Sequence, residues 1–262
     1  MRRTLEKSTS ALHLGGVKIV RMKNRKKLVM FDIDGTLIRP LRPLDGIQRF
    51  RHSIKKVFGK DIGPVTEVQW KARQYNGTTD RYILWDMAKR VGVSRDAFVD
   101  RIGEIGDAFV EYLGRISRER APYEAIPEGK QLVDAVIAAD HLSQGMLTGN
   151  LGQGASWKLH ATGYPDFAFG VYGHEADDRV DLARLIIPKA HAYFHHRFRP
   201  DDIIIIGDTV HDVSCARAIG AYVVIVATGW NVTKEEFVAN PPDLHVDSLM
   251  DEPVLKLLGL GK

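Results

Sequence analysis

The chain has almost no cysteine and no long apolar run, and both absences narrow what it can be. Its single cysteine, Cys215, cannot form a disulfide within the chain, which is compatible with a reducing compartment. No apolar run approaches the roughly 18 to 20 residues that a membrane helix needs. Internal repeats and low-complexity tracts are also absent. We therefore expect a cytoplasmic globular protein without a membrane partner.

Negative charge is scarce at the N-terminus and nowhere else. Residues 1–27 contain nine Lys or Arg against one acid, Glu6, whereas the rest of the chain contains 28 basic and 32 acidic residues. The sequence pI near 9.1 therefore describes a basic N-terminal segment. For residues 1–26 we considered a targeting segment, a nucleic-acid arm, a disordered leader, and sequence upstream of a true start at Met22. We expect a disordered tail.

Apolar runs and helical stretches alternate over most of the chain. Hydrophobic residues make up 44% and charged residues 27%, near the averages for folded proteins. Five short apolar runs are typical of buried parallel strands: residues 27–33, 145–149, 167–173, 202–208 and 222–229. Helical stretches precede the last four of these runs, at residues 128–140, 154–162, 178–187 and 211–220. This alternation predicts an α/β, Rossmann-like parallel sheet, in which ligands bind beyond the carboxyl ends of the strands.

Residues 43–126 break this alternation. Helical periodicity at 47–58, 81–92 and 95–116 occupies the segment, and no convincing strand interrupts it. Prolines lie at both connections to the rest of the chain and would make semi-rigid hinges: Pro40, Pro43, Pro122 and Pro127. The expected organisation is a tail at 1–26, an α/β core at 27–42 and 127–262, and an inserted α-helical cap at 43–126.

Acidic residues gather at two strand ends. Asp32 and Asp34 follow the first apolar run, and Asp208 and Asp212 lie in the segment GDTVHD at 207–212. Neighbouring carboxylates repel, so such a pair persists where a cation neutralises it or where one member keeps its proton. Mg²⁺ uses few carboxylates, keeps several waters and bridges to substrate phosphate. The acids therefore predict a Mg²⁺ site and phosphoryl chemistry.

The segment LTGN at 147–150 supplies groups that suit an anion. The Thr148 hydroxyl and the amides of Gly149 and Asn150 would hold phosphate oxygens, because backbone N–H groups at a helix start favour negative charge. A basic side chain is also needed to stabilise charge on a transferring phosphoryl group. Arg179 and Lys158 are the two candidates.

Four motifs in order carry a resemblance to a known family. DxDGT at 32–36, the threonine of LTGN, a later basic residue and GDTxxD at 207–212 resemble the haloacid dehalogenase (HAD) superfamily of aspartate-nucleophile phosphatases. The resemblance covers roughly residues 27–250 and points to the phosphoglycolate phosphatase branch. It implies a Mg²⁺-dependent hydrolase of phosphoric monoesters. The implied partner is a small phosphorylated metabolite, with no nucleic acid bound by the folded body.

The resemblance also implies roles for the acids. Asp32 would attack phosphorus and form an aspartyl phosphate. Asp34 would protonate the leaving oxygen and then deprotonate the hydrolytic water. Mg²⁺ would be bound by Asp32, by Asp208 and by the backbone carbonyl of Asp34. Asp212 would be a direct or water-mediated ligand.

Six residues are expected to contact the substrate or its phosphate: Gly35, Thr36, Gly149, Asn150, Thr78 and Asp80. The cap residues among them lie in YNGTTDRYIL at 75–84, which resembles a turn that approaches the substrate when the cap of this branch closes. An equally good interpretation of this stretch is a helix start capped by Thr78 or Thr79.

Two further functions stay open. A sugar-phosphate mutase of the same superfamily would keep both Asp32 and Asp34, and a non-catalytic relative would bind phosphate ligands without turnover. A haloacid dehalogenase is disfavoured, because its reaction needs no leaving-group acid at Asp34. His191 and His195 have i,i+4 spacing, but we expect a partly exposed helix face there and no transition-metal site.

Overall fold

The computed structural model describes residues 12–14, 17–19, 25–73, 75, 77–228 and 234–261. Most of the expected tail at 1–26 therefore lies outside the described residues, as does Gly229 at the end of a predicted strand. Within the tail, strands β1 (Leu12–Leu14) and β2 (Val17–Ile19) pair in antiparallel orientation.

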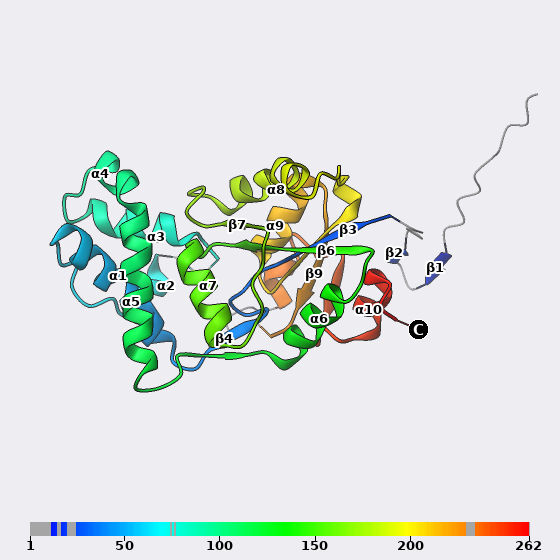
Figure 1. Cartoon of the computed structure of the whole chain (residues 1–262), viewed down its shortest axis with the longest axis horizontal. Coiled ribbons are helices and arrows are strands. Elements are labelled where there is room, and N and C mark those ends of the chain that lie inside the picture. The colour runs from blue at the N-terminus through cyan, green and yellow to red at the C-terminus, as the bar shows by residue number, and fades with distance from the viewer. Residues whose placement is uncertain are drawn as a thin grey trace, which may run out of the picture.

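The main sheet contains six parallel strands in the order β10-β9-β8-β3-β6-β7 (Figure 1). Its strands are β3 (Lys27–Phe31), β6 (Leu142–Thr148), β7 (Gly170–Tyr172), β8 (Ile203–Gly207), β9 (Tyr222–Val226) and β10 (Leu244–Val246). Every residue of β3 and β8 is buried, as expected for central strands covered on both faces. The predicted α/β parallel sheet is confirmed. Strand β10 was not predicted, because its three residues form no apolar run.

Helices cover both faces of this sheet (Figure 1). Helices α6 (Pro127–Ile137), α7 (Gly152–Ala161) and α10 (Glu252–Leu258) pack on one face, and α8 (Arg179–Phe194) and α9 (Val210–Ile219) on the other. Side chains of β3 alternate between the two faces, so that Val29 and Phe31 enter one apolar core and Leu28 and Met30 the other. Helices α6 to α9 match the predicted helical stretches to within a few residues at most ends, whereas α8 continues beyond its predicted end.

We call residues 43–126 the cap segment. Its helices are α1 (Pro43–Phe58), α2 (Glu67–Ala72), α3 (Asp80–Lys89), α4 (Arg95–Asp100) and α5 (Ile102–Ser117). They surround an apolar cluster of their own and lie at one end of the molecule (Figure 1). The single helix predicted over 95–116 is two helices, because Arg101 leaves the helical region with φ −108° and ψ 16°.

Two short strands join the cap segment to the core. Strand β4 (Ile38–Pro40) leads out of the core, and β5 (Tyr123–Ala125) pairs with it in antiparallel orientation on the way back. The expectation of a segment without strands is therefore wrong at its C-terminal end. β5 has only three residues, and a strand this short shows no periodic pattern in the sequence. Single 3₁₀ turns occur at Pro200–Asp202 and Lys234–Phe237.

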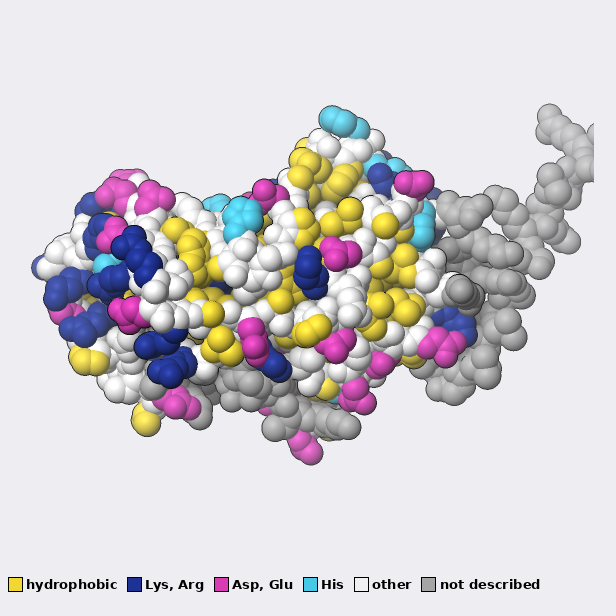
Figure 2. Space-filling view, turned by 60° about the horizontal axis from the view of Figure 1, so that its bottom comes forward, with side chains coloured by type: hydrophobic (Ala, Val, Ile, Leu, Met, Phe, Trp, Pro, Cys, Tyr) yellow, Lys and Arg dark blue, Asp and Glu magenta, His cyan; other side chains and the backbone are white. Residues whose placement is uncertain are grey.

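Lys and Arg side chains gather over the cap end of the molecule, interleaved with Asp and Glu (Figure 2). In the cap segment, Arg51 and Lys55 both pair with Asp61, and Lys56 pairs with Glu111. These cations therefore do not form an uninterrupted basic face. Among the described residues, no helix has both the length and the apolar character that crossing a membrane requires.

Candidate active site

Three acids meet at the carboxyl ends of β3 and β8. Asp32 directly follows β3, and its amide donates to the carbonyl of Ile206 at 2.9 Å. Asp208 directly follows β8, and Asp212 lies in the first turn of α9. All three acids are buried, and one carboxylate oxygen from each lies within 4.8 Å of the other two. Neighbouring parallel strands end at the same edge of a sheet, so the strand order itself produces this cluster.

Gly35 allows the chain to turn past this cluster. Its φ is 91°, a value that side-chain-bearing residues rarely adopt. A Cβ atom here would lie 2.1 Å from Oδ2 of Asp208. Glycine is therefore required at position 35, because a side chain would clash with Asp208. The expected contact of Gly35 with the substrate stays a prediction. The neighbouring Thr36 is fully buried, and its hydroxyl has no hydrogen-bond partner among the described residues.

Burial disfavours the ionised forms of two acids in this cluster. Burial raises the pKa of Asp32 to about 7; Arg179 opposes this rise, and Asp212 and Asp34 add to it. Burial, together with Asp212 and Asp32, also raises the pKa of Asp208 well above its usual range. In addition, Oδ1 of Asp208 is buried without a hydrogen-bond partner among the described residues.

These residues fit a divalent metal ion. The donors are all carboxylate oxygens, which Mg²⁺ prefers, and one of them has no other partner. Asp32, Asp208 and Asp212 are the side chains that would hold the ion. The carboxylate of Asp34 lies outside this group of three, and the role of its backbone carbonyl as a ligand stays a prediction.

Arg179, the first residue of α8, faces the acid cluster. Its Nη2 atom lies 2.6 Å from Oδ1 of Asp212 and 3.5 Å from Oδ1 of Asp32. Burial disfavours the charged guanidinium, but Asp32 and Asp212 outweigh burial and raise the pKa of Arg179. Arg179 is thus a fixed cation beside the expected nucleophile. The side chain of Asp178 holds this helix start in place by accepting from the amide of Val180 at 2.7 Å.

Asp212 has a structural task as well. Its Oδ2 atom accepts from the amide of Thr209 at 3.0 Å and from the Thr209 hydroxyl at 2.7 Å, which forms a capping box at the start of α9. Helix capping and membership of the acid cluster therefore coexist in one residue.

Asp34 lies in a different setting. Nζ of Lys158, on α7, lies 2.8 and 2.7 Å from the two carboxylate oxygens of Asp34, and the Asn150 side-chain amide donates to one of them at 2.7 Å. Burial disfavours ionisation, but Lys158 and Asn150 outweigh it and lower the pKa of Asp34. Asn150 also accepts from Lys158 at 2.7 Å and donates to the Thr148 hydroxyl at 2.8 Å. A continuous network thus links Asp34 to the end of β6.

Both basic candidates therefore face the site, but they serve different acids. Arg179 lies beside Asp32, and Lys158, only 1% exposed, lies beside Asp34. The sequence indicated the Asn150 amide as a phosphate ligand. The structure shows that amide donating to the Thr148 hydroxyl at 3.3 Å, while the Asn150 side chain contacts Asp34. This side-chain contact was not predicted, and the asparagine at the end of LTGN was the only signal for it in the sequence.

The cap segment reaches the same edge through the start of α3. The amide of Asp80 donates to the carbonyl of Gly149 at 2.7 Å, and a Cβ on Gly149 would lie 2.5 Å from the carbonyl oxygen of Thr78. The hydroxyl of Thr79 accepts from the amide of Tyr82 at 3.1 Å and caps the helix. The stretch therefore starts a helix capped by Thr79 and also contacts the core, whereas the expected contact with the substrate stays a prediction.

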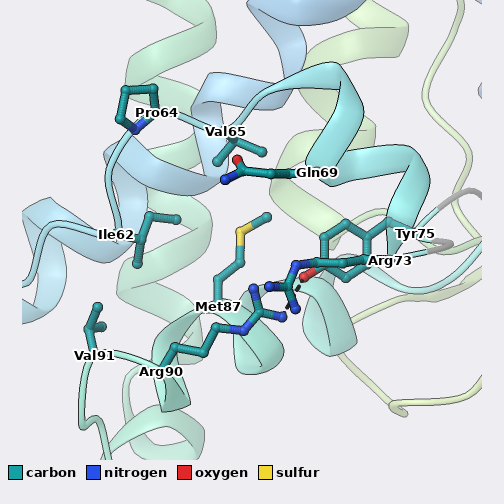
Figure 3. A pocket seen from close by; sticks show the side chains of 9 residues that line it. All are labelled: Ile62, Pro64, Val65, Gln69, Arg73, Tyr75, Met87, Arg90 and Val91. Carbon is teal, nitrogen blue, oxygen red and sulfur yellow. Dashed lines mark hydrogen bonds between the residues drawn. The ribbon is translucent and has the colours of Figure 1, made fainter.

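A separate hollow of about 100 Å³ lies within the cap segment (Figure 3). It is lined by Ile62, Pro64, Val65, Gln69, Arg73, Tyr75, Met87, Arg90 and Val91. Its cations are already partnered: Arg90 donates to the Tyr75 hydroxyl at 3.1 Å, and both Arg90 and Arg73 pair with Asp86. None of the predicted site residues lines this hollow.

The two histidines with i,i+4 spacing remain apart from the site. His191 lies in the last turn of α8 and His195 ends it, and both are exposed. In the part of the chain that the structure describes, the three acids are the single group of three or more possible metal ligands.

Comparisons with known proteins agree with this fold. Residues 182–251 match a family model described as HAD-hydrolase-like. No curated protein sequence matches the chain significantly. Among solved structures, CbbY from Rhodobacter sphaeroides in complex with phosphate is 16% identical, with a TM-score of 0.63, over 88% of this chain and 99% of CbbY.

Two further structures are similar over comparable lengths. A predicted phosphoglycolate phosphatase from Haemophilus somnus 129PT is 19% identical, with a TM-score of 0.60, over 90% of this chain and 99% of its own. A CbbY variant in complex with xylulose-1,5-bisphosphate is 15% identical, with a TM-score of 0.61, over 85% of this chain and 94% of its own. At identities this low, the structural similarity establishes a shared fold and no more. The predicted resemblance to the HAD superfamily is confirmed at the level of the fold.

Proposed function

Because the chain has the fold of the HAD hydrolases and matches their family model over residues 182–251, we propose that it is a Mg²⁺-dependent phosphatase. Its substrate is a small-molecule phosphomonoester, and the reaction passes through an aspartyl phosphate on Asp32, as in phosphoglycolate phosphatases. One observation carries the proposal: a buried group of three carboxylates faces a buried guanidinium, with Arg179 Nη2 3.5 Å from Oδ1 of Asp32. The phosphate and the sugar bisphosphate bound to CbbY support a phosphorylated substrate.

In the first step, an oxygen of Asp32 forms a bond to phosphorus while the bond from phosphorus to the leaving oxygen breaks. Arg179 stabilises the charge on the transferring group from its position between Asp32 and Asp212. When bound, Mg²⁺ would neutralise part of the negative charge of the acids and of the phosphoryl oxygens. Burial of Asp32, which is 5% exposed, keeps bulk water from this step.

Asp34 manages the protons. Lys158 and Asn150 favour its ionised form, which suits the second step, in which Asp34 accepts a proton from the water that attacks the aspartyl phosphate. The first step needs the opposite form, with a proton for the leaving oxygen. We infer that this proton reaches Asp34 with a singly protonated phosphate group of the substrate, whose second pKa is about 6.

The direct test is hydrolysis of p-nitrophenyl phosphate by the purified chain. We expect turnover with Mg²⁺, none with EDTA, and none in Asp32→Asn. The matched control is Asp166→Asn, which changes a carboxylate that is 79% exposed and should leave turnover unchanged. Turnover that persists in Asp32→Asn would refute the nucleophile. A panel of metabolite phosphates would then rank substrates, and isomerisation of a sugar phosphate without phosphate release would identify a mutase instead.

A further inference from the structure

The two residues proposed to act on the phosphorus are buried in the described conformation: Asp32 is 5% exposed and Arg179 is 7% exposed. We infer that a phosphate ester reaches Asp32 when the cap segment moves away. For the reaction, the cap segment must then return to the docked arrangement. Turnover therefore depends on the contacts that hold the cap segment in the docked arrangement.

One side of the α3 start is tied to the loop after β6. The Asp80 amide donates to the carbonyl of Gly149 at 2.7 Å, and the Asp80 carboxylate accepts from the amide of Leu151 at 3.0 Å. This loop also carries Asn150 and directly follows Thr148, the last residue of β6, so docking of α3 restrains the network around Asp34.

The other side of the α3 start holds the loop between β7 and α8. The Thr79 hydroxyl donates to the carbonyl of Asp177 at 2.8 Å. Arg81 donates to the carbonyl of His174 at 2.9 Å, and its Nε atom lies 3.0 Å from Oδ1 of Asp177. Arg95, at the start of α4, pairs with the other carboxylate oxygen of Asp177. Two cap arginines thus meet on one core carboxylate.

Asp177 is close to the catalytic machinery along the chain. Asp178, its neighbour, caps α8, and Arg179 is the first residue of that helix. Consecutive Cα atoms are about 3.8 Å apart and the helix start is fixed by its cap, so a restraint on Asp177 also restrains Arg179. Arg81 and Arg95 pair with Asp177 and are not members of the acid cluster.

We propose that Arg81 and Arg95 are positioning residues: by pairing with Asp177, they couple docking of the cap segment to the placement of Arg179 beside Asp32. The inference rests on the proposed function, because it takes Arg179 to act in the reaction. The side chains of Arg81, Arg95 and Asp177 are 21%, 35% and 41% exposed. Ion pairs with this exposure shift an equilibrium by up to about fivefold each, and salt screens them.

Kinetics test the coupling. Asp177→Asn, which weakens both pairs, should lower kcat about fivefold to tenfold with a smaller change in KM. Asp177→Glu should recover part of the loss. Combining Asp177→Asn with Arg81→Gln should cost less than the product of the single effects, because the two changes remove the same contact. The control is Arg184→Gln, which breaks an exposed pair with Asp181 on the same helix and should have no effect.

Ionic strength provides a readout that a merely structural role would not move. Between about 0.05 M and about 1 M KCl, wild-type kcat should fall towards the Asp177→Asn value, whereas the variant should change little. Equal kinetics in Asp177→Asn and Arg184→Gln would overturn the proposal. Independent, multiplicative effects of Asp177→Asn and Arg81→Gln would overturn it as well.

Hydrogen exchange separates this inference from the proposed function. In Asp177→Asn, amides of residues 149–152 and 174–180 should exchange faster than in wild type, whereas Arg184→Gln should leave them unchanged. This result needs no turnover. Faster exchange in a chain without phosphatase activity would refute the phosphatase and retain the docking contact. Unchanged exchange in an active enzyme would refute the docking contact alone.

Discussion

Asp32 and Asp34 are separated by one residue and yet lie in opposite electrostatic settings. Burial raises the pKa of Asp32 to about 7, against Arg179 and with the help of two further acids. Burial acts on Asp34 in the same sense, but Lys158 and Asn150 outweigh it and lower the pKa. The cations come from helices on opposite faces of the sheet, Arg179 from α8 and Lys158 from α7. Identical side chains thus acquire different chemistry from their neighbours.

The largest effects are expected from variants that remove one acid from each setting. Asp34→Asn and Asp208→Asn should each lower turnover by at least about 100-fold, because one removes the proton carrier and the other a metal ligand. Only Asp208→Asn should raise the Mg²⁺ concentration for half-maximal binding, by at least about tenfold. Calorimetric Mg²⁺ titrations measure this difference. An equal loss of Mg²⁺ affinity in Asp34→Asn would show that the two settings are not separate.

Asp32 and Asp34 should make the stability of the fold depend on pH in opposite senses. The folded pKa of Asp32, about 7, exceeds its unfolded value of about 3.9, so the folded chain binds the extra proton. Without metal, stability should therefore be highest in acid on this account and fall by up to about 4 kcal/mol as pH rises from about 4 to about 7. Asp34, with its lowered pKa, acts in the opposite sense: its stabilisation is fully present above about pH 4 and is lost as the pH falls below that value.

Mg²⁺ should offset the loss of stability that ionisation of Asp32 causes as the pH rises. We expect Mg²⁺ to raise the thermal midpoint more at about pH 8 than at about pH 5.5, since at the lower pH protons compete for the acid cluster. Thermal melts at both pH values, with Mg²⁺ or with EDTA, check this. The same increase in Tm at both pH values would contradict the raised pKa of the cluster.

Lys158→Met should destabilise the fold by about 1–3 kcal/mol, because Asp34 and the buried Asn150 lose a charged donor. In Asp34→Asn, the same lysine change should cost less, since no carboxylate remains to be stranded. Urea unfolding of the four chains of this cycle gives the coupling. Lys130→Met, at a partly buried position whose side chain is 42% exposed, is the control and should change stability by less than about 0.5 kcal/mol. Additive free energies would argue that Lys158 and Asp34 do not interact.

The smallest expected effect concerns Cys215, which lies on the Asp32 side of the sheet. Its thiol lies 3.2 Å from the carbonyl of Arg179, and burial raises its pKa to about 12. Less thiolate is then present at pH 8, so Ellman's reagent should not label the folded chain and should label it fully in urea. Rapid labelling without denaturant would show that this side of the sheet opens readily.

Much of the fold could be predicted because its central strands are largely apolar. β3 and β8 are buried along their whole length, and each contains four consecutive apolar residues. β5 and β10 could not be predicted in this way, since three residues whose partners lie far along the chain have no periodicity to detect. The break at Arg101 was also hidden, because α4 and α5 on either side carry the same helical pattern.

Three of the four predicted acids, Asp32, Asp208 and Asp212, do lie together, because motif spacing places them at the ends of adjacent strands. The division of labour between Arg179 and Lys158 depends on which helix faces which acid, and one sequence does not fix that. The pairing of Asp177 with Arg81 and Arg95 was also out of reach. Charged residues on helices far apart in the chain ordinarily face solvent, and only the docked fold brings these three together.

The central claim, that Asp32 becomes phosphorylated, is tested most directly by crystallising the chain with Mg²⁺ and beryllium fluoride, which mimics a phosphoryl group on a carboxylate. The account predicts a beryllium fluoride adduct on a carboxylate oxygen of Asp32, adjacent to Arg179. An adduct on another acid, or Asp32 left unmodified under these conditions, would contradict it.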